Sequence, residues 1–199
     1  MGDMNPDDGG LWSRSVAGDG EAFGLLFDRH RDRVYRHAYR LAQNRPDAED
    51  VSAAAFLELW RLRTRVRLVE NSVLPWLLVT TTNCALNLRR SRRRYDALLR
   101  RIPHAPAAAD PADIVLSDDP FHGVDEHLAC ALRALKPVDL QLITLVVLEG
   151  YDLASAAGIL GLGPEVAKTR LHRARHRLRE HLPGLNAPRQ LTLLEEGQS

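Results

Sequence analysis

The sequence has little of several features that define large classes of proteins. Its 2 cysteines are too few for a disulfide framework, and we interpret Cys84 and Cys130 as small core residues in a reducing compartment. No apolar run approaches the length that spans a membrane. The N-terminal stretch MGDMNPDDGG also lacks the apolar segment of a signal peptide. We therefore expect a cytoplasmic protein without membrane insertion.

The sequence motifs that mark common enzymes are missing as well. The 8 histidines form no HExxH or nucleophile arrangement, and no glycine-rich phosphate loop occurs. One metal site stays open as an alternative, because His122, His127 and Cys130 could share a helix face. Solvent-exposed histidines and a core thiol are the commoner interpretation of such a group. We expect no enzyme, no cofactor, no metal and no small-molecule substrate.

No alternation of apolar and polar residues is long enough to predict a β-strand, whereas apolar residues recur at the three- and four-residue spacing of helices. Residues 21–43 carry one amphipathic stripe, and Asn44 is a plausible cap before a second helix over 46–65. A further helix is expected over 74–94 and beyond, with Ser72 as its N-cap. The predicted fold class is all-α, with two small helical domains joined by a flexible linker.

Charge is segregated along the chain, although the net charge is only +1. Residues 21–101 carry 17 Lys/Arg against 9 Asp/Glu, and residues 128–182 carry 8 against 5. Residues 102–127 carry 6 Asp/Glu and no Lys/Arg. Two basic blocks around an acidic connector indicate two surfaces for an anionic partner. The expected organisation is a mobile N-terminal arm (1–20), a first helical domain (21–101), an acidic linker (102–126), a helix-turn-helix domain (127–182) and a C-terminal tail (183–199).

The end of the second basic block has the pattern of a helix-turn-helix. Small residues over 153–160 allow close helix packing, Gly161 and Gly163 permit a turn, and Pro164 begins a long basic helix. The second helix of such a unit enters the major groove, where base edges meet its N-terminal half and phosphates meet its flanking cations. An ordinary helical hairpin with a solvated basic face is the alternative.

The first basic block contains a helix with two different faces, residues 74–94 (LPWLLVTTTNCALNLRRSRRR). The face expected to be buried carries Leu74, Leu77, Leu78, Thr81, Ala85 and Leu88. The other face carries Trp76, Thr80, Asn83, Asn87, Arg90 and Arg94. Arginines suit phosphates, and amides suit base edges or extruded bases. A solvated basic helix end is the alternative.

Three segments resemble sigma factors of the sigma-70 family. Residues 131–182, with the core KTRLHRAR at 168–175, look like sigma region 4. PDAEDVSAAAFLELW (46–60) is similar to the core-binding helix of region 2, and PWLLVTTTNCALNLRRSRRR (75–94) to the helix that reads and opens the promoter. Two such blocks with only a linker between them resemble the extracytoplasmic-function (group 4) subclass.

The resemblance implies a transcription initiation factor that binds core RNA polymerase, recognises minus-10 and minus-35 promoter elements and promotes strand opening. An anti-sigma protein is a further implied partner. The implied polymerase-binding residues are Asp47, Glu49, Asp50, Phe56 and Trp60. The implied minus-10 residues are Arg67, Glu70, Asn71, Ser72, Trp76, Asn83, Asn87, Arg89, Arg90, Arg92, Arg93 and Arg94. The implied minus-35 residues are Glu165, Val166, Lys168, Thr169, Arg170, His172, Arg173 and Arg175.

The sequence departs from the family pattern at two places. Ala53 and Ala54 stand where the family usually has a Gln-Glu pair, and this loss removes polar contacts to the polymerase. Glu165 and Val166 stand where Gly-Thr is frequent, and a carboxylate there could accept a hydrogen bond from cytosine or repel a phosphate. Two other functions remain open: a stand-alone helix-turn-helix regulator, and a degenerate sigma paralogue that mainly binds an anti-sigma protein.

Overall fold

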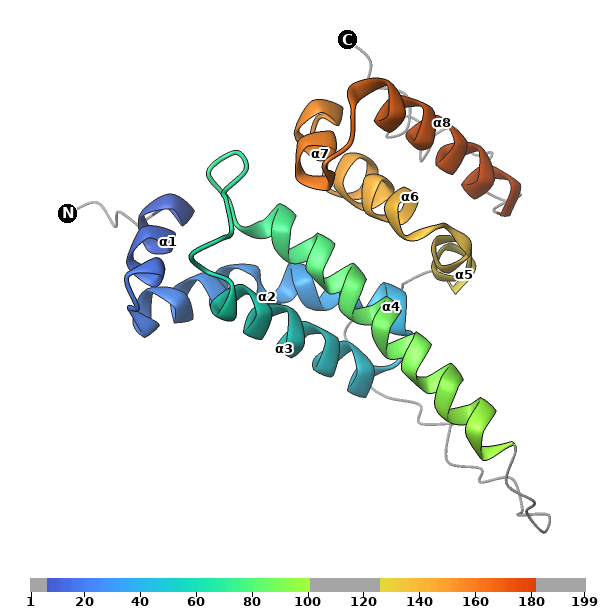
Figure 1. Cartoon of the computed structure of the whole chain (residues 1–199), viewed down its shortest axis with the longest axis horizontal. Coiled ribbons are helices and arrows are strands. Elements are labelled where there is room, and N and C mark those ends of the chain that lie inside the picture. Colours follow the sequence, from blue (N-terminus) through green and yellow to red (C-terminus); the bar gives the residue numbers. More distant parts are fainter. Residues whose placement is uncertain (1–6, 101–125, 182–199) are drawn as a thin grey trace.

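A computed structural model describes residues 7–100 and 126–181, and these residues contain helices and no strand. The first module consists of α1 (Asp8–Val16), α2 (Gly20–Ala42), α3 (Arg45–Arg61) and α4 (Leu74–Leu99) (Figure 1). The second consists of α5 (Glu126–Ala134), α6 (Pro137–Leu142), the π-helix η1 (Ile143–Leu148), α7 (Leu153–Leu160) and α8 (Pro164–His181). The all-α prediction is therefore confirmed. The expected tail and the expected linker, apart from Glu126, lie outside the described residues.

The first module is a bundle in which α2, α3 and α4 pack on one another. Its core includes Leu26, Leu59, Leu77 and Leu78, none of which has exposed side-chain surface. The apolar face expected on α4 is buried from Leu74 to Thr81, but it becomes only half-buried at the positions beyond. The outer part of α4 thus leaves the core, and Figure 1 shows it projecting past the other helices.

Local capping explains one predicted helix boundary and contradicts another. Asn44 is the N-cap of α3 and accepts a hydrogen bond from the Asp47 amide at 2.9 Å, as expected. The prediction that Ser72 caps α4 is wrong, because the N-cap position is Val73. The Ser72 hydroxyl does accept a bond from the Leu74 amide, at 3.2 Å, but it donates its own proton to Asp8.

Residues 8–16 contradict the expectation of a mobile arm over 1–20. They form α1, which Asp7 caps by accepting a hydrogen bond from the Gly10 amide at 2.9 Å. Leu11 and Trp12 of this helix are buried in the same core as α2. The short apolar pair Leu-Trp is too brief to give a periodic signal, yet it supplies enough buried area to dock a nine-residue helix.

The second module packs α8 across α5, α6 and α7. The helix expected from Pro137 to Gly150 is present, but its second half is the π-helix η1, in which the Glu149 amide donates to the Thr144 carbonyl at 3.1 Å. A π-helical segment widens the turn and rotates the side chains that follow it. Glu149 consequently lies with only 7% of its side chain exposed, against α2 of the first module.

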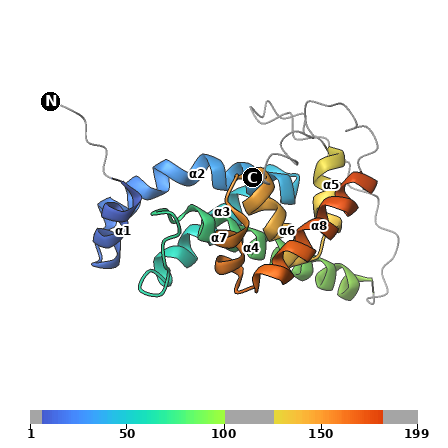
Figure 2. The same cartoon turned by 90° about the horizontal axis from the view of Figure 1, so that it is seen from above.

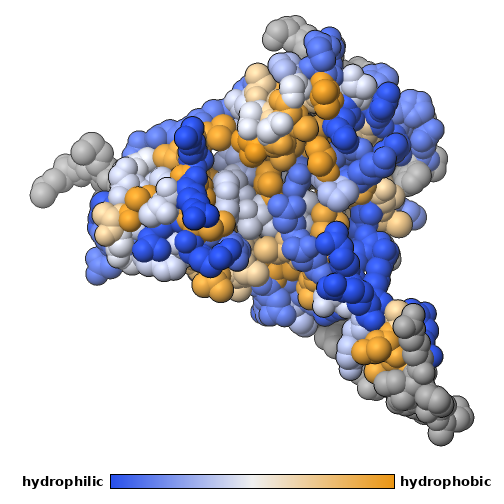
Figure 3. Space-filling view, viewed as in Figure 1, coloured by the Kyte–Doolittle hydropathy of each residue, from blue (hydrophilic) through white to orange (hydrophobic). Residues whose placement is uncertain are grey.

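The two modules lie against each other along α4. Figures 1 and 2 agree in placing α6 beside α4, and a single buried apolar cluster runs through both modules. Cys130 is exposed, so its expected place in the core is wrong, while Cys84 is partly buried. Figure 3 shows hydrophilic side chains along most of the outer part of α4, a hydrophobic group at its far end, and further hydrophobic side chains gathered over α6 and α7. Among the described residues, no helix is both long and apolar enough to cross a membrane.

Candidate nucleic-acid interfaces

The segment between α3 and α4 carries a tight turn at residues 69–72. The Val69 and Ser72 backbones exchange hydrogen bonds of 3.1 and 3.0 Å, and the two residues between them adopt left-handed conformations. Glu70 has φ 50° and Asn71 has φ 57°. Two successive positive φ values make a tight two-residue turn, in which asparagine is common and glutamate is unusual. The turn leaves the side chains of Arg67, Glu70 and Asn71 exposed.

The polar face of α4 begins next to this turn. Trp76 is half-buried, whereas Asn83, Asn87 and Arg90 are exposed, as the helical pattern predicts. On the opposite side, the buried hydroxyls of Thr81 and Thr82 donate to the carbonyls four residues earlier, at 2.7 and 3.0 Å. These bonds satisfy the buried threonines, so the β-branched TTT segment is compatible with a helix.

The five arginines that end the predicted minus-10 surface divide into two groups. Arg92 forms an ion pair with both carboxylate oxygens of Asp47, and Arg89 donates to the Arg133 carbonyl of the second module at 3.2 Å. Among the described residues, Arg90 bonds only to its neighbour Asn87, at 3.3 Å. Arg93 and Arg94 are exposed, and within the described parts of the chain neither forms a hydrogen bond or ion pair. The arginines open to a phosphate are therefore Arg90, Arg93 and Arg94.

The residues expected to contact the polymerase do not share one exposed surface. Asp47 is 5% exposed and is held by Asn44 and Arg92. Phe56 is also buried, with its ring 4.7 Å from that of Phe27, and Trp60 packs edge-on to another ring of α2. Both aromatic residues thus hold α3 to α2.

A different face of α3 remains open. It carries Glu49, Asp50, Ala53 and Leu57, and Leu57 is 67% exposed. Sequence reasoning missed Leu57, although it lies seven residues after Asp50 and thus on the same helical face. This face therefore combines one large exposed apolar side chain with two carboxylates. Ala53, one of the two departures from the family pattern, is exposed between Asp50 and Leu57.

The predicted helix-turn-helix is formed by α7 and α8. Asp152 caps α7 by accepting from the Ser155 amide at 2.9 Å, and Gly161 ends it with φ 63°. A residue with a side chain would be strained at this left-handed position. The small residues Ala156 and Ala157 are buried and join Ala167 of α8 in the core, which lets the two helices approach closely.

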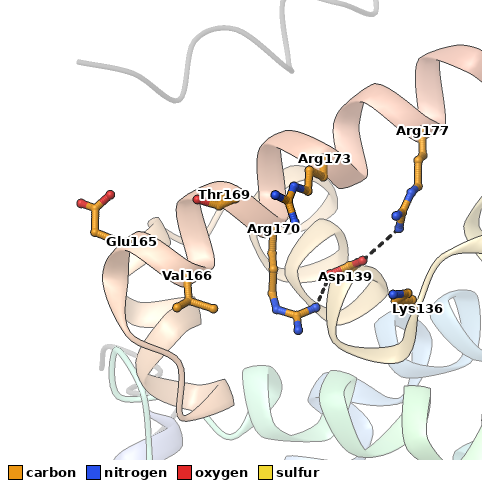
Figure 4. A pocket seen from close by; sticks show the side chains of 8 residues that line it. All are labelled: Lys136, Asp139, Glu165, Val166, Thr169, Arg170, Arg173 and Arg177. Carbon is orange, nitrogen blue, oxygen red and sulfur yellow. Dashed lines mark hydrogen bonds and ion pairs between the residues drawn. The ribbon is translucent and has the colours of Figure 1, made fainter.

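A groove of about 430 Å³ lies beside the first half of α8 (Figure 4). Asp139 of α6 is 4% exposed at its base and accepts hydrogen bonds from Arg170 at 2.9 Å and from Arg177 at 3.3 Å. Figure 4 shows Glu165 at the start of α8, at one end of this groove. The groove is lined by Lys136, Asp139, Glu165, Val166, Thr169, Arg170, Arg173 and Arg177.

The eight residues predicted for the minus-35 element differ in how accessible they are. Arg170 is held by Asp139, and Arg175 is partly buried with its Nε lacking a partner among the described residues. Burial also lowers the pKa of Arg175. The remaining six are exposed: Glu165, Val166, Lys168, Thr169, His172 and Arg173. The outer face of α8 therefore presents a mixed polar surface rather than a row of free arginines.

Within the described residues, three hydrogen bonds or ion pairs connect the modules near the predicted DNA surfaces. The Gln141 side-chain amide donates to Asn83 Oδ1 at 2.8 Å, and Arg33 of α2 forms an ion pair with Glu149. The third contact joins Arg89 to the second module, as described above. The structure thus brings Asn83 together with α6, and it places Glu70 of the turn beside Asp152 at the start of α7.

Comparison with known proteins identifies two matched regions. The model of sigma-70 region 2 matches residues 26–95, and that of sigma-70 region 4 matches residues 126–178. The chain is 34% identical over 163 residues to RNA polymerase sigma factor CarQ of Myxococcus xanthus, which covers 81% of this chain and 90% of CarQ. It is also 34% identical over 159 residues to the ECF RNA polymerase sigma factor SigE of Mycolicibacterium smegmatis, with 79% and 60% covered.

Solved structures share the fold. One is the sigma factor RpoE from Bartonella quintana, crystallised with the anti-sigma factor NepR; it has a TM-score of 0.57 and 22% identity and covers 82% of this chain and 98% of that one. Another is CnrH, solved with the cytosolic domain of CnrY, with a TM-score of 0.60, 23% identity, and 89% and 98% covered. Identities this low show the likeness of fold alone.

The fold, the two matched regions and the relatives define the class of the protein. The chain belongs to the sigma-70 family of RNA polymerase sigma factors, in its extracytoplasmic-function group. It is accordingly a transcription initiation factor.

Proposed function

We propose that this chain directs core RNA polymerase to promoters by reading a minus-10 element with α4 and its preceding turn, and a minus-35 element with α8. The observation that carries this proposal is the exposed face of α4. Two exposed amides, Asn83 and Asn87, lie between the strained turn at 69–72 and the arginines at the end of the helix.

Strand opening requires a surface that binds an unpaired base better than a stacked one. An amide beside an aromatic ring and a cationic track provides this preference, because the base edge, the base face and the phosphate each find a partner. Unstacking a base costs a few kcal/mol, which a short set of such contacts can offset. In this chain Asn83 supplies the amide, Trp76 the ring, and Arg90, Arg93 and Arg94 the track.

The minus-35 element would be read by the exposed first half of α8. Lys168, Thr169 and Arg173 point outward there, and a recognition helix places this half against base edges. Arg170 takes a different role, because its guanidinium is committed to Asp139 and orients α8 on α6. We therefore assign phosphate binding to Arg173 and a structural role to Arg170.

The polymerase would meet the open face of α3. Glu49, Asp50 and Leu57 combine charge and apolar surface on one side of the helix. The buried Asp47 holds this helix to α4 through its ion pair with Arg92. The chain acts by binding, and RNA synthesis belongs to the polymerase. We also propose a cytoplasmic location, where promoter DNA and polymerase are found. RpoE and CnrH were each solved with a protein partner, which supports an anti-sigma protein as a partner of this chain.

Run-off transcription with core polymerase on genomic promoter fragments tests the proposed function. A specific transcript is expected only when the chain is added, and the chain should co-purify with core enzyme. If no specific transcript forms and the chain does not co-purify with core enzyme, the proposal is overturned in favour of a stand-alone regulator. Such a regulator would bind duplex DNA tightly without polymerase.

Two variants test the role of Asn83 within that assay. Asn83→Ala should slow open-complex formation about tenfold while leaving initial promoter binding nearly unchanged. Gln141→Ala is the matched control, because it removes the same hydrogen bond between the modules and leaves the Asn83 amide in place. Equal defects in the two variants would mean that Asn83 serves the fold and not the DNA.

A further inference from the structure

Helix α1 lies outside both matched regions, since the region 2 match begins at residue 26. It nevertheless packs on α2 and bonds directly to the segment before α4. In Figure 1 it lies beside the chain segment that joins α3 to α4. No comparison gives this helix a role, so its contacts are the evidence for one.

Asp8 is the centre of these contacts. Its carboxylate is 7% exposed and accepts hydrogen bonds from Arg29 at 2.7 Å, from His30 at 2.7 Å and from the Ser72 hydroxyl at 2.6 Å. The Val73 amide adds a longer bond of 3.4 Å. Burial alone would raise the pKa of Asp8, but the bonds from His30, Ser72 and Arg29 hold it well below its usual range. The group is therefore an anion that joins α1, α2 and the start of α4.

Asp7 and Gly9 extend the contact to the turn itself. The Asn71 side-chain amide donates to Asp7 at 2.8 Å, and Asp7 at the same time caps α1. Gly9 lies so close to Asn71 that an added Cβ would collide with its Oδ1. Any side chain at position 9 would push Asn71 away. The first turn of α1 thus fits the side chain of Asn71 closely.

The turn needs such support because of its backbone. Glu70 and Asn71 are consecutive non-glycine residues in the left-handed region, a conformation that persists only where neighbouring groups enforce it. Ser72 and Asn71, which bond to α1, are the last two residues of this turn. Strained backbone of this kind is common where a protein holds a ligand in one geometry.

We infer that α1 sets the shape of the minus-10 turn, with Asp8 as a positioning residue that determines which base the turn accepts. This inference rests on the proposed function of the turn. Asp8 itself is buried and does not touch DNA. It acts through Ser72 and the start of α4, while Asp7 and Gly9 fix Asn71. Loosening α1 therefore alters base choice at one promoter position and leaves the minus-35 surface of the other module unchanged.

Asp8→Asn is the first test variant, because it keeps the size of the side chain and removes its charge. Asp19→Asn is the matched control: Asp19 caps α2 and pairs with Arg14 but does not reach the turn. Amide hydrogen exchange in the full-length chain is measured first. Exchange of the Val69 and Ser72 amides should accelerate about tenfold in Asp8→Asn and stay unchanged in Asp19→Asn. Unchanged exchange in Asp8→Asn would overturn the inference, whatever the turn binds.

The second readout is run-off transcription on promoters with each base in turn at the minus-10 positions. Asp8→Asn should reduce discrimination between bases at one minus-10 position about tenfold. The dependence of transcription on the minus-35 sequence should stay as in the unsubstituted protein. An even loss on all promoters would mean that α1 only stabilises the fold, and would overturn the inference. If the original chain gives no specific transcript, the proposed function fails, and the exchange data still decide whether α1 shapes the turn.

Gly9→Ala covers the case in which Asp8→Asn does not fold. It leaves the Asp8 contacts in place and displaces Asn71 alone, since alanine is well tolerated inside a helix. The inference expects a changed base preference at the same minus-10 position. Normal folding with unchanged preference would overturn it.

Discussion

At the scale of single residues, His37 shows how a buried group can make the fold sensitive to pH. Its ring is 1% exposed, and Nε2 lies 2.8 Å from the Thr82 hydroxyl. That hydroxyl donates to the Leu78 carbonyl, so it accepts from Nε2–H. Nδ1 has no partner within the described residues. Burial, with a smaller contribution from the charge of Arg40, lowers the pKa of His37 to about 3.

The free energy of unfolding is therefore expected to fall in mild acid. The unfolded chain binds a proton at His37 below about pH 6.5, whereas the folded chain does not until about pH 3. The difference in proton binding therefore costs no stability above pH 6.5. As the pH falls from 6.5 towards 3 it lowers the free energy of unfolding, by about 2 kcal/mol at pH 5. Urea unfolding of His37→Gln at pH 7.5 and pH 5 should lack this part of the pH dependence. His176→Gln, at an exposed histidine, should retain it; equal behaviour of the two variants would refute the assignment.

Arg170 and Arg173 are three residues apart on α8, yet the structure gives them different partners. Arg173→Ala should weaken minus-35 binding by the holoenzyme almost uniformly across sequences and reduce the salt slope by about 1, because one phosphate contact is lost. Arg170→Ala should instead lower the free energy of unfolding by about 1 to 2 kcal/mol, because it leaves the buried Asp139 with Arg177 alone. Titrations in increasing KCl and urea unfolding separate the two. A lower salt slope in Arg170→Ala would contradict this division.

At the scale of helices, the sequence predicts well where local chemistry decides the structure. The helix over 153–160, the glycine turn after it and the start at Pro164 agree with the structure, because capping and turn residues act within a few positions. Contacts between distant residues were not predictable in this way. Asp8 and Ser72 are 64 positions apart, so no periodicity indicates that α1 exists or that Ser72 donates to it rather than capping α4.

The same limit applies to the candidate polymerase surface on α3. A run of carboxylates predicts an exposed helix start, but only the packing shows that Asp47 turns inward to Arg92 while Leu57 stays outside. Leu57→Glu is expected to weaken core polymerase binding about tenfold, since a charge replaces apolar contact area. Leu25→Glu is the control, because Leu25 is likewise exposed, at 47%, but lies on α2. Affinity measured by fluorescence anisotropy should change only in the first variant; an equal loss in both would remove α3 from the interface.

At the scale of the whole molecule, the contact between the modules limits access to Asn83. Gln141 donates a hydrogen bond to the side-chain oxygen of Asn83, and the Arg33–Glu149 ion pair holds the end of η1 against α2. Sequence patterns placed Asn83 correctly on the polar face of α4 but gave no sign of a partner from the other module. If Asn83 binds a base, the two modules must separate first, and the free energy of their contact opposes DNA binding by the free chain.

Weakening that contact should therefore favour DNA binding without polymerase. Gln141→Ala combined with Glu149→Gln removes the hydrogen bond to Asn83 and the charge that holds Arg33, and leaves the candidate DNA residues intact. We expect the radius of gyration of the double variant to rise in X-ray scattering. Its affinity for a single-stranded minus-10 oligonucleotide should increase about tenfold, because less of the binding energy is used to separate the modules. Glu180→Gln, at an exposed residue that pairs with His176 of its own helix, is the control for the change in net charge. A more extended chain with unchanged affinity would show that the modules do not compete with DNA for α4.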